Sequence, residues 1–317
     1  YLPTMFVGLV LFRLLRPVLQ GRGRRGVFAV MGGLCILLGY WTVERNRLWN
    51  DPLAFWTHTV AKKPQSARAR SNLGAALTRS GDPLKAIVQL KNALELERNR
   101  PEVYLNLAAA YIDISNDDKA IESYRKALAL SGEAPAVLLR FAVFQMQRGW
   151  YEAAENLLRR GLAKNPRHAG FLNQLGRIYH KRQKPNEAIK LFNQAIAADA
   201  GLADAYGNLG QVLFEMGKKN EGRMALQQAV RLDQNNVSRI YNLGYAYEKM
   251  GRFAEAVAQY ERVLKINPLD GDVLYRTGYL LVEKLGNVQE GIQLLRRAVK
   301  VAPTDPRAET ANMFLKR

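Results

Sequence analysis

The sequence predicts an all-α protein, an α-solenoid of stacked helical hairpins, because one spacing and two composition patterns recur along most of its 317 residues. A large apolar residue recurs every 34 residues, and the residue that follows it is always glycine or alanine. A second small residue comes twelve positions after the first, and another large apolar residue comes four positions later. Small residues at facing positions let two antiparallel helices approach closely, and large residues fill the space beside them. The first set of large residues is Leu73, Leu107, Phe141, Leu175, Leu209 and Leu243, with Thr277 next in register.

The spacing divides residues 67–305 into seven hairpins. Proline follows several of the second helices, as at Pro166 and Pro268, and it cannot continue a helix. The predicted hairpins are 67–100, 101–134, 135–168, 169–202, 203–236, 237–270 and 271–305, the last with one extra residue near Gly286. A helix–turn–helix of 34 residues with this pattern resembles the tetratricopeptide repeat. The resemblance implies that the stacked repeats form a right-handed superhelix.

Shorter segments flank the hairpins on both sides. Residues 44–66 are predicted to hold a linker and the second helix of an eighth, incomplete repeat that begins near Asp51. Residues 306–317 are predicted to form a capping helix. Such a helix would cover the apolar face that a terminal repeat otherwise exposes.

Residues 1–43 are predicted to form the membrane segment of the chain. Residues 1–12 carry no charge, and residues 26–43 are eighteen uncharged residues, just long enough to cross a bilayer. Between these segments stand five arginines, a distribution typical of cytoplasmic loops: Arg13, Arg16, Arg22, Arg24 and Arg25. We therefore expect N-terminal helices that anchor the chain in membrane lipid. The repeats are expected on the extracytoplasmic side, which is the periplasm if the membrane is a bacterial inner membrane.

The sequence offers no pattern typical of catalysis or of cofactor binding. Residues 21–26 have the G-x-G-x-x-G spacing of dinucleotide-binding loops, but the strand before and the amphipathic helix after that such a loop needs are missing. The three histidines are scattered, the single cysteine excludes an internal disulfide, and no metal-ligand spacing occurs. We therefore predict no cofactor, no metal and no enzymatic activity in this part of the chain.

The formal net charge of +19 favours anionic partners such as phospholipid headgroups and acidic proteins. A basic cluster lies at residues 177–184, but its one aromatic residue, Tyr179, falls at a packing position of the repeat. Proteins that bind single-stranded nucleic acid place aromatic side chains among the basic ones for base stacking. We therefore expect no nucleic-acid partner.

A column of amides is predicted to line the inner surface of the repeats. The residue before each recurring large apolar residue is Asn72, Asn106, Arg140, Gln174, Asn208, Asn242 and Arg276. An amide side chain offers a donor and an acceptor together, so it can pair with a peptide backbone irrespective of the peptide's side chains. We predict that the asparagines and the glutamine bind an extended peptide. The alternative is that these amides are only hydrated surface.

Tyrosines extend this predicted binding surface toward the C-terminus. Tyr241, Tyr245, Tyr275 and Tyr279 fall at two inward positions of consecutive repeats, near Phe214. Exposed tyrosines are frequent anchors for partner contacts. For Tyr275 and Tyr279 the alternative is an extra packing layer under the capping helix.

The junction at residues 1–66 adds a second resemblance. Tyr1-Leu-Pro-Thr4 precedes an apolar segment, and Glu44-Arg-Asn-Arg-Leu-Trp49 leads through Asp51 and Phe55-Trp56 into the first repeat. This combination resembles the C-terminal part of polytopic membrane proteins with tetratricopeptide repeats, a group that includes the protein O-mannosyltransferases of the endoplasmic reticulum and bacterial relatives. The resemblance implies that the repeats present an acceptor polypeptide to a membrane domain that precedes them. It supplies no catalytic residue, because no position matches the family's catalytic loop.

These observations together favour a membrane-anchored scaffold that binds protein partners or extended peptides. One alternative is the acceptor-recognition half of a membrane glycosyltransferase whose catalytic half lies upstream of Tyr1. Another alternative is a structural subunit of a larger membrane protein complex.

Overall fold

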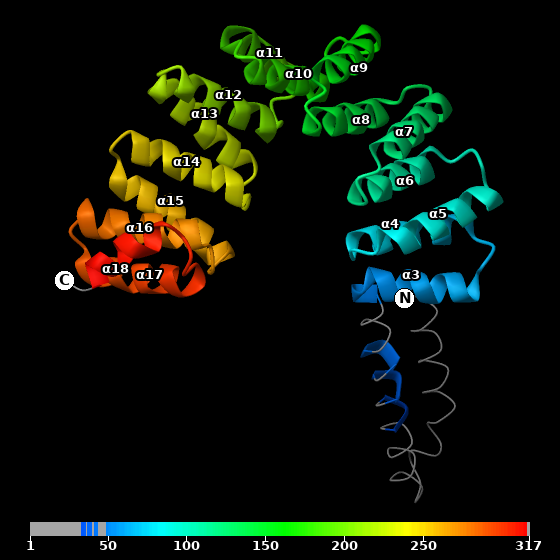
Figure 1. Cartoon of the computed structure of the whole chain (residues 1–317), viewed down its shortest axis with the longest axis horizontal. Helices are drawn as coiled ribbons and strands as arrows, with labels where there is room; N and C mark the ends of the chain where they lie inside the picture. The colour runs from blue at the N-terminus through cyan, green and yellow to red at the C-terminus, as the bar shows by residue number, and fades with distance from the viewer. Residues whose placement is uncertain (1–32, 36, 40, 44–48, 316–317) are drawn as a thin grey trace, which may run out of the picture. The chain divides into compact units, whose positions relative to one another are not determined.

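The computed structural model describes residues 33–35, 37–39, 41–43 and 49–315 (Figure 1). From Pro52 onward, consecutive α-helices are joined by short turns, and no β-strand occurs among the described residues. The helices form two compact units, one that ends at Gly132 and one that begins at Glu133.

The first unit contains one helix and two hairpins. Its helices are α3 (Pro52–Lys62), α4 (Ala67–Arg79), α5 (Pro83–Leu96), α6 (Pro101–Asp113) and α7 (Asp117–Ser131). Helices α4 and α5 pair, as do α6 and α7, and α5 packs on α6. Helix α3 packs on α4, at the place predicted for the second helix of an incomplete repeat.

The second unit contains five hairpins and a terminal helix. Its helices are α8 (Pro135–Gln147), α9 (Tyr151–Lys164), α10 (Ala169–Lys181), α11 (Pro185–Ala198), α12 (Ala203–Glu215), α13 (Lys219–Leu232), α14 (Val237–Lys249), α15 (Phe253–Ile266), α16 (Gly271–Glu283), α17 (Val288–Val301) and α18 (Arg307–Leu315). Within each hairpin the two helices pack on each other, and successive hairpins are in contact. Each of the seven predicted hairpins holds one of these helix pairs, so the predicted all-α fold of consecutive pairs is confirmed.

The small residues of the repeat lie where the two helices of a hairpin come closest. A Cβ atom added to Gly176 of α10 would stand 2.6 Å from the Phe192 ring of α11, and that ring is fully buried. Such a distance is far below an ordinary carbon–carbon contact. Glycine at the first position therefore makes room for the large residue of the second helix, as the spacing predicts.

The turn inside each hairpin repeats its backbone conformation as well as its position. Gly149 has a φ of 78°, and the residue 34 positions later, Gln183, has a φ of 58°. Glycine adopts this left-handed conformation without a steric penalty, whereas other residues rarely do. The two helices reverse direction at this residue.

Most of the segment predicted to span a membrane lies outside the described residues, as do all five clustered arginines. Among the residues that are described, no helix is both long enough and apolar enough to cross a bilayer.

Helix α18 packs on α17 and α16 at the end of the second unit. Ala308 and Ala311 of this helix are buried, and the Phe314 ring meets the Tyr279 ring edge-on, with centroids 6.2 Å apart. The segment predicted to cap the last hairpin is thus helical and covers part of its face.

Candidate functional site

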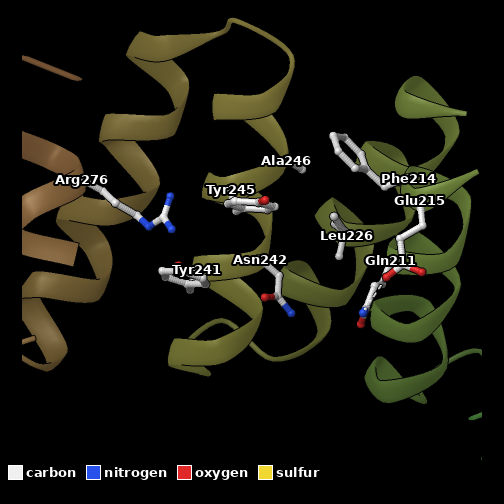
Figure 2. A pocket seen from close by; sticks show the side chains of 9 residues that line it. All are labelled: Gln211, Phe214, Glu215, Leu226, Tyr241, Asn242, Tyr245, Ala246 and Arg276. Atoms are coloured by element: carbon white, nitrogen blue, oxygen red, sulfur yellow. Dashed lines mark hydrogen bonds between the residues drawn. The ribbon is translucent and has the colours of Figure 1, made fainter. Parts of the chain in front are cut away.

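A cavity of about 390 Å³ opens between the first helices of three successive hairpins in the second unit. Figure 2 shows Glu215 and its neighbours on α12 facing the tyrosines of α14, with Arg276 of α16 beyond them. The cavity is lined by Gln211, Phe214, Glu215, Leu226, Tyr241, Asn242, Tyr245, Ala246 and Arg276. The site therefore combines apolar walls with two amides and two charged groups. Concave sites of this composition are typical of ligand and partner binding.

The Arg276 side chain is held in place by acids from two helices. Its Nε donates to Asp272 Oδ2 at 3.0 Å, and its Nη1 donates to Glu248 Oε1 at 3.2 Å. Its guanidinium carbon lies 5.9 Å from the centroid of the Tyr241 ring and 5.4 Å from that of Tyr245. Cations at such distances are attracted to the ring faces. The arrangement orients both tyrosines at the cavity wall.

Asp272 is the centre of this cluster. Its carboxylate also accepts hydrogen bonds from the Tyr241 hydroxyl, at 2.7 Å, and from the Arg307 guanidinium of α18. Burial alone would raise the pKa of the Asp272 carboxyl, but the Arg307 and Tyr241 hydrogen bonds and the Arg276 charge lower that pKa below its ordinary value. The carboxylate therefore stays charged and keeps its partners in place.

The two buried tyrosine hydroxyls respond in the opposite direction. Burial and the hydrogen bond to Asp272 raise the pKa of Tyr241 to about 12. Burial and the hydrogen bond to Glu248 raise the pKa of Tyr260 as well. Both hydroxyls therefore remain neutral hydrogen-bond donors at physiological pH, which suits a fixed scaffold.

The predicted amides of the second unit fall in three different environments. The Asn208 amide donates to Asn173 Oδ1 of the preceding hairpin at 2.9 Å, so part of its hydrogen-bonding capacity is used inside the fold. Gln174 accepts from Arg177 at 2.7 Å. Asn242 is exposed in the cavity, and no described residue is hydrogen-bonded to its side chain.

The residue 35 positions earlier accounts for the difference between Asn208 and Asn242. For Asn208 that residue is Asn173, and for Asn242 it is Gly207, which has no side chain. Asn106 of the first unit follows the same rule, because its amide donates to Ser71 Oγ at 3.3 Å. Asn72 is half-buried in the first unit, and its side chain has no hydrogen-bond partner among the described residues.

The four predicted tyrosines are divided between two places. Tyr241 and Tyr245 line the cavity, whereas Tyr275 and Tyr279 stack on each other with centroids 6.2 Å apart. The Arg307 guanidinium lies 5.0 Å from the centroid of the Tyr275 ring. Since α18 packs over this pair, Tyr275 and Tyr279 do not extend the cavity, and the structure favours the packing alternative for both.

Three contributors to the site were not among the residues predicted for it. Gln211 and Glu215 stand one helical turn apart at the end of α12, and Arg276 appeared in the amide column only as an exception. One signal in the sequence was available. Gln211 and Tyr245 are 34 residues apart, so the tyrosine column continues into the preceding hairpin with a polar residue. Among the described residues, no group of three or more potential metal ligands is found.

Comparisons with solved structures place this architecture among known helical-repeat proteins. The chain is similar to yeast Tom70 with a TM-score of 0.64 and 16% identity, over 83% of this chain and 57% of that one. It is similar to the Cut9–Hcn1 hetero-tetramer of APC/C with a TM-score of 0.56 and 17% identity, over 84% and 51%. The similarity to PilF of Pseudomonas aeruginosa has a TM-score of 0.50 and 18% identity, over 78% and 96%. At these identities the likeness shows the fold alone.

The sequence comparisons identify the family of the chain. No curated protein sequence matches it. None of the comparisons indicates a catalytic family or a relation to the membrane mannosyltransferases. Residues 56–313, which include every hairpin, match the family model described as the cilia and flagella-associated protein 70 C-terminal domain, of tetratricopeptide-repeat type. The chain therefore belongs to the family of the cilia and flagella-associated protein 70 C-terminal domain.

Proposed function

We propose that the chain is a membrane-anchored scaffold that binds an extended segment of a protein partner in the cavity between α12, α14 and α16. The observation that carries the proposal is Asn242, an amide without an internal partner, placed between aromatic walls. Its donor and acceptor can both pair with one peptide unit of a bound segment. The same position in the preceding hairpin, Asn208, already donates to Asn173, so the peptide contact is concentrated at Asn242.

The apolar surface of the cavity supports the same function. The Tyr245 side chain is 37% exposed, and Phe214 packs partly against the core beneath α14. Tyrosine and phenylalanine contribute large contact areas at little cost in conformational entropy, which is why they are frequent at binding hot spots. Because Tyr241 and Arg276 are fixed by Asp272, the wall does not have to reorganise when a segment binds.

Replacing Asn242 by alanine is expected to weaken a bound peptide by about 1 kcal/mol, roughly fivefold in affinity, the net contribution of one hydrogen bond. The measurement is calorimetric titration with an extended peptide selected against the wild-type chain. Asn208→Ala is the matched control. It is expected to lower the free energy of unfolding by about 1 kcal/mol, through loss of the Asn173 contact, and to leave peptide affinity nearly unchanged. Equal affinity of wild type and Asn242→Ala would show that the amide is only hydrated.

We also propose that residues 1–43 anchor the chain in a bacterial inner membrane and that the repeats face the periplasm. The support is the apolar segment at residues 26–43 and the five arginines before it. The resemblance of residues 1–66 to membrane glycosyltransferases favours one version of this proposal, in which the bound segment is an acceptor polypeptide. A membrane complex that holds the cavity occupied by a neighbouring subunit is the other version.

Protease added to intact spheroplasts is expected to remove the repeats, because the proposed location exposes them outside the inner membrane. The measurement is immunoblotting of the C-terminal region with time, and a cytoplasmic marker protein serves as the control. Protection of the repeats until the inner membrane is lysed would reverse the proposed topology and leave the peptide-binding proposal intact.

A further inference from the structure

The two charged side chains that line the cavity differ in how far their charge is already compensated. Arg276 is 25% exposed and bonds both Asp272 and Glu248, so two carboxylates surround one guanidinium. An anionic group of a ligand would have to displace these acids to use Arg276. The arginine is therefore part of the wall and not a free receptor for a negative charge.

Glu215, on the opposite side of the cavity, keeps its negative charge available. Its side chain is 52% exposed, and no lysine or arginine among the described residues pairs with it. Gln211 Nε2 donates to its Oε1 at 2.9 Å, and His180 Nε2 lies 2.6 Å from its Oε2. A neutral amide orients the carboxylate without cancelling its charge, and a neutral imidazole does the same. Each oxygen retains the capacity to accept a further hydrogen bond.

Apolar surface adjoins this carboxylate inside the cavity. Phe214 precedes Glu215 on α12, and the exposed Tyr245 ring faces them from α14 (Figure 2). Lysine and arginine combine an aliphatic stem with a cationic head, so one such side chain can meet both kinds of surface. The Tyr245 ring also attracts cations through its face. Charge and shape thus agree on one kind of ligand side chain.

We infer that the cavity selects a partner segment that carries a lysine or an arginine, with the cation at Glu215 and the stem against Phe214 and Tyr245. The inference rests on the proposed peptide-binding function. The formal charge of +19 on the whole chain repels basic partners at long range, but salt screens this repulsion beyond about 8 Å at physiological ionic strength. The selection is therefore made at contact, by one carboxylate.

The test compares peptides that differ at a single position. Starting from an extended peptide selected against the full-length chain, each position in turn is made lysine, norleucine or glutamate, and affinities are measured by calorimetry at pH 8. At one position lysine is expected to bind about 3–10-fold more tightly than norleucine, and glutamate more weakly than either. The preference for lysine should shrink as salt is added.

Glu215→Gln keeps the shape of the side chain and removes its charge. In this variant the preference for lysine should fall to less than about twofold, with the affinity for the norleucine peptide unchanged. The matched control is Glu261→Gln, which removes an exposed carboxylate of α15 outside the cavity and should retain the full preference. If no extended peptide binds at all, the proposed function fails. If peptides bind without a lysine preference, or the preference survives Glu215→Gln, this inference is wrong and the peptide-binding proposal stands.

Discussion

Replacing Gly210 by alanine is expected to lower the free energy of unfolding by about 1–3 kcal/mol, although alanine is ordinarily the better helix former. A Cβ atom at this position would stand 2.7 Å from Leu226 Cγ and 2.8 Å from the carbonyl oxygen of Gly222. The second contact is to backbone, which cannot rotate away, so α12 and α13 would have to separate. Alanine occupies the same register at Ala108 and Ala142, and the cost therefore comes from the close approach in this particular hairpin.

Gly207→Ala is the matched control, because it lies one helical turn earlier on α12. Its added Cβ atom would be 3.9 Å from Ala229 Cβ, an ordinary contact. Stability should rise by up to about 1 kcal/mol through the helix propensity of alanine. Urea unfolding of both variants, followed by circular dichroism, checks the prediction. Equal stabilities of the two variants would mean that the hairpin can widen without loss, and close packing at Gly210 would not explain the glycine.

The helix pairs were predictable from the sequence because the period reflects a backbone requirement. Each hairpin needs a small residue where its helices approach, and a missing Cβ atom at Gly176 is visible in any sequence. The environments of side chains in the same register were not predictable in this way. Asn208 and Asn242 share one register, yet the first is paired and the second exposed, because Asn173 and Gly207 precede them by 35 residues.

Contacts between elements far apart in the chain also limited the prediction of the site. Asp272 and Arg276 stand four residues apart, and a pair at this spacing can be recognised on a predicted helix. Glu248 and Arg307 join the cluster from α14 and α18, and no short-range pattern connects them with it. In the same way, Tyr275 and Tyr279 repeat the positions of cavity tyrosines, but the terminal helix packs over them. Position in the repeat predicts which face a side chain occupies, and the neighbouring element decides what that face contacts.

Replacing Arg276 by methionine is expected to cost about 2–3 kcal/mol of unfolding free energy at pH 7. The substitution keeps most of the apolar stem and leaves Glu248 and Asp272 with one cationic partner fewer. These two carboxylates are only 20% and 34% exposed, so the charge that remains is poorly hydrated. Removing one member of a buried ion pair costs about 3–5 kcal/mol, and partial exposure reduces that figure. The control is Arg252→Met, whose ion pair with Glu255 is more than 40% exposed on both sides and should contribute less than about 1 kcal/mol.

The pH dependence of the Arg276→Met defect separates lost charge pairing from lost packing. The pKa of Asp272 in the folded wild type lies below its ordinary value of 3.8, so its contribution to stability is present above that pH and is lost as the pH falls through the lower folded value. Arg276 contributes to this lowering, and the variant should show less of it. The difference in stability between wild type and variant should therefore narrow as the pH is lowered from 7 to about 3, while a packing defect would stay constant. Urea unfolding at both pH values measures this. A defect at pH 7 no larger than that of Arg252→Met, or one that does not shrink in acid, would show that the Asp272–Arg276–Glu248 cluster does not hold the cavity wall together through charge.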